Sequence, residues 1–441
     1  MCNVVTKITA TNTIRLSADL FLVNLPEGIS GERTESTARM SPPTDAEDTL
    51  AELVDETNGF TFDLYQELLA DSPDENLFSS TVSVSIALAM TYAGARGETR
   101  DQMRDVLRYT LDNELHEGFV RLQQALDERG DEDTDERDRF SEDGETPFEL
   151  SIVNSLWGQD GVPFDEEYRE TVDSYGSFAD VDFRTDAEAA RTQINQWIAD
   201  ATEGRIENLL AEGTVDERTV LVLVNAVYFL ANWAHQFEQG MTREQPFTAL
   251  DGTTHEVPMM SQQHSFPYAE VDGTQAVELP CVGGDVSMLV VLPPEDEFES
   301  YEQSVDSATV VELVDTLEKQ EGRVSLPRFE FESGFGLGSV LEQMGMRDAF
   351  DAQDADFGAM VSKDESDEDL YLDDVYHKSF VAVDEAGTEA AAATTAMMGT
   401  TSVPKDPFEF VADRPFLFAI RDRPTGTVLF LGRAVDPAGW E

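Results

Sequence analysis

The chain is nearly continuously apolar from Val220 to Leu230, and Asn225 is the one polar interruption. A short apolar run of this kind predicts a strand that is buried on both faces. The stretch Leu150–Trp157 also has the composition of a strand. Four further strands are predicted later in the chain, at Ser287–Leu292, Arg323–Phe331, Arg414–Arg421 and Thr427–Arg433.

A helix is predicted to begin at Asp45. The apolar residues that follow recur at the spacing that places them on one face of a helix. Strands and helices then follow each other without a βαβ rhythm, which favours the α+β class. No internal repeat is visible. The apolar positions of the first helix are Leu50, Leu53, Val54, Leu64, Leu68 and Leu69.

A second pattern lies near the C-terminus, where residues 390–404 carry no charge although 27% of the chain is charged. Side chains of a strand alternate between its two faces. If Thr388 points inward, every second residue from Ala390 to Met398 does so too, and all of these are small or apolar. The segment is therefore compatible with an exposed position and with a buried strand. An Ala-rich linker or helix is the alternative, since alanine is the best helix former.

The charge is strongly one-sided. The 441 residues carry 90 acidic and 29 basic side chains, a formal net charge of −61, while 41% of residues are hydrophobic and 26 are Phe. This composition predicts a folded protein adapted to high salt, where a Debye length of about 3 Å at 1 M screens the self-repulsion. We expect loss of structure in dilute buffer, and full stability without salt would contradict this. The only lysines are Lys7, Lys319, Lys363, Lys378 and Lys405.

The same charge argues against several partners and ligands. Nucleic acid requires a basic surface, and polyanions such as heparin require one as well. Cys2 and Cys281 show no metal or redox spacing, and the sequence contains no apolar run long enough to cross a membrane. The sequence therefore predicts no metal site, no cofactor and no membrane segment. His116, His235, His255 and His264 also lack metal-ligand spacing.

Two segments differ from the rest in charge. Residues 1–44 carry four basic and four acidic side chains, and they predict a disordered N-terminal extension or a start codon assigned too early, with Met40 as the better start. No signal peptide is readable there, so an extracellular and a cytoplasmic location both stay open. Residues 126–147 are acidic and predict a solvated surface insertion rather than a metal site.

The run Gly387–Thr394, preceded by His377–Glu385, resembles the hinge of the reactive-centre loop in serpins. The chain is identified as a member of that family because further serpin motifs follow in the family's order. The resemblance implies a single serpin domain over residues 45–441, with three β-sheets, about eight or nine helices and an exposed loop over residues 385–410. Thr81 departs from the family, which usually has proline there. The other motifs are Asn76–Met90, Gly94–Thr99, Asn195–Ile198, Thr202–Ile206, Asn225–Trp233, Leu326–Phe329, Asp413–Phe418 and Leu431–Arg433.

The family function implied is suicide inhibition of a serine protease in a covalent complex. The protease attacks a bait bond in the loop, and the cleaved loop inserts as a strand into a large sheet. Counting from the hinge places the bait bond at Thr401–Ser402, whereas counting back from the C-terminal motif places it near Pro404–Lys405. A small neutral residue before the bait bond, such as Thr401, suits subtilisin-like or elastase-like proteases. Met397 and Met398 are alternative residues for that position. The hinge residues are Glu385, Gly387, Thr388, Glu389, Ala390, Ala391, Ala392 and Ala393.

The resemblance also assigns two polar clusters with conformational roles. A shutter beneath the sheet holds its central strands, and a breach at the top of the sheet marks where insertion begins. No nucleophile elbow or catalytic triad is apparent, so the chain is not expected to be an enzyme. We expect a monomer, and the alternative function is a non-inhibitory serpin that acts as a chaperone, carrier or storage protein. The shutter residues are Ser80, Ser83, Asn225 and His377, and the breach residues are Trp233, Arg328 and Glu385.

Overall fold

The computed structural model describes residues 44–111, 114–129, 148–202, 204–361, 370–388 and 407–440. The predicted N-terminal extension up to residue 43 lies outside these ranges, as do residues 130–147 of the predicted insertion and residues 389–406 of the predicted loop. Helix α4 continues to Glu128, so the first residues of the predicted insertion form its last turn.

Helices and strands mix along the described chain, as the α+β prediction requires. The helix predicted from Asp45 begins at Thr44. Among the described helices, none is both long and apolar enough to cross a membrane. The helical elements are α1 (Thr44–Asp71), α2 (Thr81–Tyr92), α3 (Gly97–Val106), α4 (Leu115–Glu128), α6 (Glu166–Asp173), α7 (Phe183–Ala201), α8 (Phe298–Glu302), α9 (Ser307–Thr316) and α10 (Gly338–Met344), with short 3₁₀ turns at Gln239–Met241, Asp348–Phe350 and Pro437–Gly439.

A central sheet carries the region of functional interest, and its strand order is β10-β11-β4-β2-β3. Strand β11 runs parallel to β4, whereas β10 and β2 run antiparallel to their neighbours β11 and β4. The two-residue strand β12 pairs with β4 outside this order. The bounds are β2 (Phe148–Gln159), β3 (Ser177–Val181), β4 (Leu221–Asn232), β10 (Phe329–Gly336), β11 (Val375–Val383) and β12 (Gly387–Thr388).

The other strands form one hydrogen-bonded network in the order β1-β15-β14-β8-β7-β6-β9-β13, with β5 on β6. The long strand β6 pairs first with β5 and β9 and at its end with β7, so its partners change along its length. Counted by hydrogen bonding, the described strands form this network and the central sheet. The bounds are β1 (Leu77–Ser79), β5 (Arg243–Thr248), β6 (Thr254–Val271), β7 (Thr274–Pro280), β8 (Val286–Leu292), β9 (Glu318–Pro327), β13 (Phe408–Val411), β14 (Phe416–Asp422) and β15 (Val428–Ala434).

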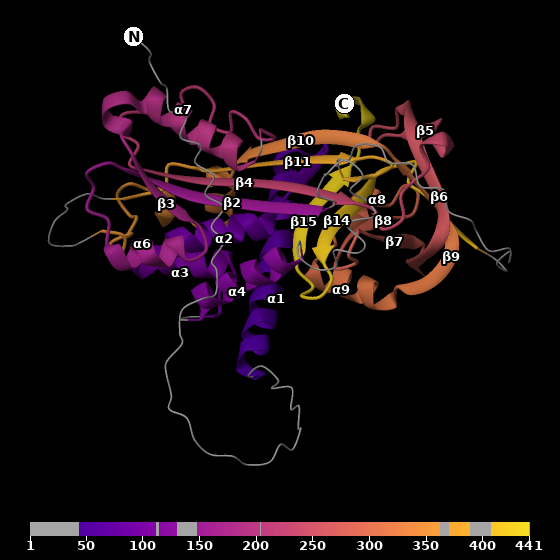
Figure 1. Cartoon of the computed structure of the whole chain (residues 1–441), viewed down its shortest axis with the longest axis horizontal. Coiled ribbons are helices and arrows are strands. Elements are labelled where there is room, and N and C mark those ends of the chain that lie inside the picture. Colours follow the sequence, from indigo (N-terminus) through magenta and orange to yellow (C-terminus); the bar gives the residue numbers. More distant parts are fainter. Residues whose placement is uncertain are drawn as a thin grey trace, which may run out of the picture. The chain divides into compact units, whose positions relative to one another are not determined.

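Strand β4 is buried on both faces, as its apolar run predicts. Val222 and Val224 belong to a core that also contains Ile194 of α7, whereas Leu221 and Leu223 belong to the main core. Figure 1 shows α7 on one side of the central sheet and α2 on the other. Every residue of α2 is buried. Asn225 therefore lies in the part of β4, residues 221–229, in which every residue is buried.

The segment Arg323–Phe331, predicted as one strand, is two strands in different sheets. Strand β9 ends at Pro327, and β10 begins at Phe329. Proline has no N–H to donate to a ladder, and the next N–H, that of Arg328, donates to the carbonyl of Pro258. The apolar pattern continues across this point, so periodicity alone did not separate the two strands.

Candidate functional site

Four polar side chains meet beneath the central sheet, and all four are buried. The Asn225 Oδ1 of β4 lies 2.5 Å from the Nδ1 of His377 on β11. Its Nδ2 donates to the Ser83 hydroxyl of α2 and to the Oδ1 of Asn154 on β2. The structure therefore brings together three of the predicted shutter residues and adds Asn154. The cluster links the two central strands to the helix beneath them.

The direction of these hydrogen bonds follows from a single backbone donor. The Ser80 N–H donates to the His377 Nε2 at 3.1 Å, so Nε2 is an acceptor and the imidazole proton is on Nδ1. That proton is donated to the Asn225 Oδ1, which orients the Asn225 amide. Burial lowers the pKa of His377 to about 3, so the ring is neutral near pH 7.

Hydroxyl groups extend the cluster into the neighbouring layers. The Ser80 hydroxyl donates to the carbonyl of Leu429 on β15 at 2.8 Å. The Ser379 hydroxyl of β11 donates to the carbonyl of Phe78 on β1, and the Phe78 N–H donates to the Ser333 hydroxyl of β10. Hydroxyls can exchange partners when strands separate, whereas apolar side chains offer no such exchange. The central strands are thus held by hydrogen bonds whose hydroxyl groups can form new hydrogen bonds when the strands separate.

The pairing of β11 with β4 covers only part of their length. It extends from Val375 to Ser379 on β11, although that strand continues to Val383. Near the end of β4, Gly387 and Thr388 of β12 pair antiparallel with Asn232 and Ala231 instead. The first residues of the predicted hinge therefore already form a strand pair with β4.

A tight turn brings the chain back toward β4 at this point. The Asp384 N–H donates to the Gly387 carbonyl at 2.9 Å, and the Asp384 carboxylate accepts from the N–H groups of Ala386 and Gly387. The buried Trp233 fixes the turn from the other side: its N–H donates to the Ala386 carbonyl and its indole Nε1 donates to the Asp384 carbonyl. The turn is held by backbone hydrogen bonds, the Asp384 carboxylate and the Trp233 indole.

Gly387 is required by the close approach of the two backbones. A Cβ at this position would lie 2.1 Å from the Ala231 carbonyl oxygen and 2.6 Å from the Asn232 Cα. Both are backbone atoms of β4, so no side chain can move aside to make room. Only glycine fits where β12 pairs with β4.

Glu385 and Arg328 approach each other but form a loose pair. The nearest nitrogen–oxygen distance is 3.9 Å, and the Arg328 side chain is 54% exposed. The Glu385 carboxylate has a closer partner in the Thr242 hydroxyl, at 2.5 Å, and the Glu385 carbonyl accepts from the N–H of Phe237. An exposed pair of this length adds little stability. The three predicted breach residues therefore lie together, with Trp233 and Thr242 making the closer contacts to the turn.

Comparisons with known proteins agree with this geometry. The sequence profile described as Serpin (serine protease inhibitor) matches residues 55–437. The chain belongs to the serpin family. An uncharacterized serpin-like protein of Thermococcus kodakarensis is 40% identical over 90% of this chain and 89% of its own length. Antithrombin-III of Mus musculus is 35% identical over 88% of this chain and 82% of its own length.

The solved structures show the same fold. Uncleaved ovalbumin superposes with a TM-score of 0.75 and 30% identity, covering 87% of this serpin and 100% of the ovalbumin chain. The serpin fold predicted from the sequence is confirmed by this likeness.

Several predicted site residues of this serpin have no described position. Hinge residues Glu389 and Ala390–Ala393 lie outside the described residues, as does the predicted bait bond Thr401–Ser402. Conversely, the sequence prediction missed Asn154 and Asp384, which the structure places in the two clusters. Asn154 carries a weaker signal than Asn225, because its strand Leu150–Trp157 also contains Ser151 and Ser155. Asp384 carries no signal in the sequence, since its hydrogen bonds to Ala386 and Gly387 form only when the chain makes the turn.

The neutral His377 predicts a specific dependence of stability on pH. Its pKa in the folded state is below the ordinary value near 6.5, so the unfolded state binds the proton more readily. The contribution of the neutral His377 to the free energy of unfolding is complete above about pH 6.5. Below that pH it falls by about 1.4 kcal/mol per pH unit, until the pH reaches the folded pKa near 3. Urea unfolding between pH 7 and pH 5 should show a smaller decline for His377→Gln than for the unchanged serpin. Parallel pH profiles would contradict the assignment, because the two proteins share all other titrating groups.

Proposed function

We propose that this serpin is a suicide inhibitor of serine proteases of the subtilisin-like or elastase-like type. The observation that carries the proposal is the pairing of Gly387 and Thr388 with the end of β4, beyond the point where β11 stops pairing with it. A loop that already begins a strand here can extend that strand along β4 without a new nucleation step. The kinship with antithrombin-III supports an inhibitory role by analogy.

In the proposed reaction the protease serine oxygen attacks the carbonyl carbon of Thr401. The bond from Thr401 to Ser402 breaks, the Ser402 nitrogen takes up a proton as the new amine, and Thr401 stays bound to the protease as an ester. The freed N-terminal part of the loop then inserts beside β4. Residues Ala390–Ala393 suit this step because small side chains fit a buried strand between two cores.

Insertion requires β11 and β4 to separate where they still pair. That movement breaks the His377–Asn225 bond, so the cluster of Ser80, Ser83, Asn225 and His377 is proposed to act as the shutter. A matching role as the breach is proposed for Trp233, Arg328 and Glu385, which lie at the turn where the hinge enters. Both roles are conformational, and neither cluster performs chemistry on a substrate.

The test is a reaction of the full chain with subtilisin and with pancreatic elastase at high salt, followed by a denaturing gel. We expect a band near the summed mass of this 48.9 kDa chain and the protease, which resists boiling because the link is an ester. Mass spectrometry of the small released fragment identifies the bait bond among Thr401–Ser402, Pro404–Lys405 and a bond after Met397 or Met398. Clipping of the loop without a covalent band would favour a non-inhibitory chaperone or carrier.

We also propose that the protein works at high salt. The net charge of −61 supports this, because a compact state of that charge is destabilised by self-repulsion unless salt screens it. Loss of the circular dichroism signal on dialysis from 3 M KCl into dilute buffer is the expected outcome, and an unchanged signal would contradict the proposal.

A further inference from the structure

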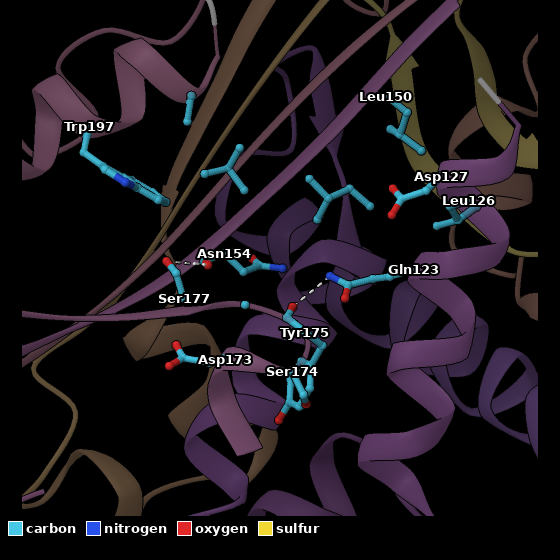
Figure 2. A pocket seen from close by; sticks show the side chains of 14 residues that line it. Gln123, Leu126, Asp127, Leu150, Asn154, Asp173, Ser174, Tyr175, Ser177 and Trp197 are labelled. Atoms are coloured by element: carbon cyan, nitrogen blue, oxygen red, sulfur yellow. Dashed lines mark hydrogen bonds between the residues drawn. The ribbon is translucent and has the colours of Figure 1, made fainter. Parts of the chain in front are cut away.

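Two of the five histidines stack on each other. His235 follows the end of β4, and His264 lies in β6. Their ring centroids are 3.6 Å apart, the ring planes are tilted by 27°, and both residues are partly buried. The other three histidines contact different groups: His116 stacks on Tyr175, which lines the pocket shown in Figure 2, His255 bonds to Thr253, and His377 bonds to Asn225.

The stacked pair joins β6 to the segment that holds the hinge turn. His235 lies midway between Trp233 and Phe237. The N–H groups of these two residues donate to the carbonyls of the turn, Trp233 to Ala386 at 2.9 Å and Phe237 to Glu385 at 2.8 Å. On the other side, the second ring belongs to β6, which is held by its pairing with β9. The position of the hinge turn therefore depends on how residues 233–237 pack on β6.

The charges that act on His235 are positive. Burial lowers the pKa of His235, and the charges of His264 on β6 and Lys319 on β9 lower it further. No carboxylate opposes them among the described residues, although the chain carries 90 acidic side chains. Of the nearby carboxylates, that of Glu238 is exposed and that of Glu385 accepts from a neighbouring hydroxyl group. The packed site therefore favours an uncharged His235.

Titratable groups on the other neighbouring elements do not offset these charges. On β9, Glu321 and Arg323 flank the residue that pairs with His264, so they project from the opposite face of the sheet. The thiol of Cys281, which bridges to the segment that contains His235, is neutral because burial raises its pKa to about 12.

The stack tolerates one charge but not two. A charged ring can pack over a neutral aromatic ring, whereas two charged rings 3.6 Å apart repel each other. The repulsion persists at high salt, because salt screens a partly buried pair less than an exposed one. Protonation of both rings therefore opposes the packing of residues 233–237 on β6.

We propose that His235 and His264 form a pH-dependent positioning pair for the hinge. With at most one ring charged, the stack holds residues 233–237 against β6, so Glu385 and Ala386 keep their backbone donors. With both rings charged, the segment separates from β6, the hinge turn loosens, and the pairing of β12 with β4 weakens. This release does not depend on the inhibitory function, whereas its effect on inhibition rests on the function proposed above.

Hydrogen exchange of the full chain in 3 M KCl, followed by mass spectrometry, measures the release. Below the ordinary histidine pKa near 6.5, the packed state binds one proton fewer than the released state, so release becomes more favourable as the pH falls. The protection of peptides that contain residues 233–237 should therefore fall roughly three- to tenfold between pH 7.5 and pH 5.5, after correction for the intrinsic exchange rate. Protection that is constant over this range would overturn the proposal.

Phenylalanine variants assign the response to the pair, because they keep stacked rings that cannot be charged. His235→Phe combined with His264→Phe should retain the protection at pH 7.5 and lose the response to pH. His264→Phe alone should give an intermediate response, since burial and Lys319 still act on His235. His255→Phe is the matched control on β6, because His255 bonds to Thr253 instead of a histidine, and it should keep the full response. A full response in either variant of the pair, or its loss in the control, would refute the assignment.

The effect on inhibition is measured separately, as the ratio of covalent complex to clipped product with subtilisin at pH 7.5 and pH 5.5. The unchanged serpin should give a lower ratio than the double variant at pH 5.5 and the same ratio at pH 7.5. Comparing the two at one pH cancels the pH dependence of the protease and of His377. Equal ratios at both pH values would refute the coupling of the pair to loop insertion. A serpin that never forms a complex would refute the proposed function, while the exchange measurements would still decide whether the pair positions the hinge.

Discussion

Replacing Gly387 by alanine is expected to turn the proposed inhibitor largely into a substrate of its protease. The added Cβ would lie 2.1 Å from the Ala231 carbonyl oxygen, and the nearest atoms all belong to the backbone of β4. The hinge can then keep its pairing with β4 only by displacing backbone, and overpacking of this kind costs about 1–3 kcal/mol. Because about 1.4 kcal/mol corresponds to a tenfold ratio, the partition between complex and clipped product should fall roughly 5- to 150-fold.

The measurement is the fraction of covalent complex on a denaturing gel at fixed protease and serpin concentrations. The matched control is Gly334→Ala in β10 of the same sheet, where a Cβ would meet only the Lys378 Cγ at 3.9 Å and the His377 carbonyl oxygen at 4.0 Å. That variant should inhibit normally. If Gly387→Ala formed as much complex as the control, the pairing of β12 with β4 would have no part in inhibition.

Replacing Arg433 by methionine is expected to give the largest loss of stability. The Arg433 side chain is 0% exposed and lies 3.1 Å from the Glu302 carboxylate, which also accepts from the Tyr65 hydroxyl. Its other nitrogens donate to the carbonyls of Ser72 and Glu75. Removing one partner of a buried ion pair leaves the other charge uncompensated and costs about 3–5 kcal/mol. The urea midpoint at constant high salt should fall accordingly.

A matched surface variant separates burial from charge in this test. Arg218→Met breaks an ion pair with Asp216 in which the Arg218 side chain is 83% exposed, so its midpoint should not change measurably. The double variant Arg433→Met with Glu302→Leu should recover part of the loss, since it removes the stranded carboxylate. Equal effects of Arg433→Met and Arg218→Met would contradict the argument.

The loss in Arg433→Met should also depend on pH. Burial raises the pKa of Glu302, and the nearby Arg433 opposes that rise. Without the arginine the pKa rises further, so the folded state binds a proton more readily than the unfolded one. Stability is then greater at low pH and is lost as the pH rises through the folded pKa. The difference from the unchanged serpin should therefore shrink between pH 8 and pH 5, and a constant difference would argue against a stranded carboxylate.

Sequence patterns were informative where a local rule applies. The apolar run around Asn225 predicted a strand buried on both faces, and β4 is such a strand, because burial on two sides leaves no place for a charge. The same rule failed between Pro327 and Phe329, where one apolar pattern crosses from one sheet to another. Periodicity reports which face is buried but not which neighbour buries it.

The sequence by itself determined the family, the α+β class and the residues that were candidates for the polar clusters. It did so because chain order, apolar periodicity and isolated polar residues in apolar strands are all local properties. It could not determine that the Asn154 Nδ2 is buried without a hydrogen-bond partner among the described residues, nor that Gly387 lies against the backbone of β4. These facts depend on distances between residues far apart in the chain, and only the tertiary structure sets them.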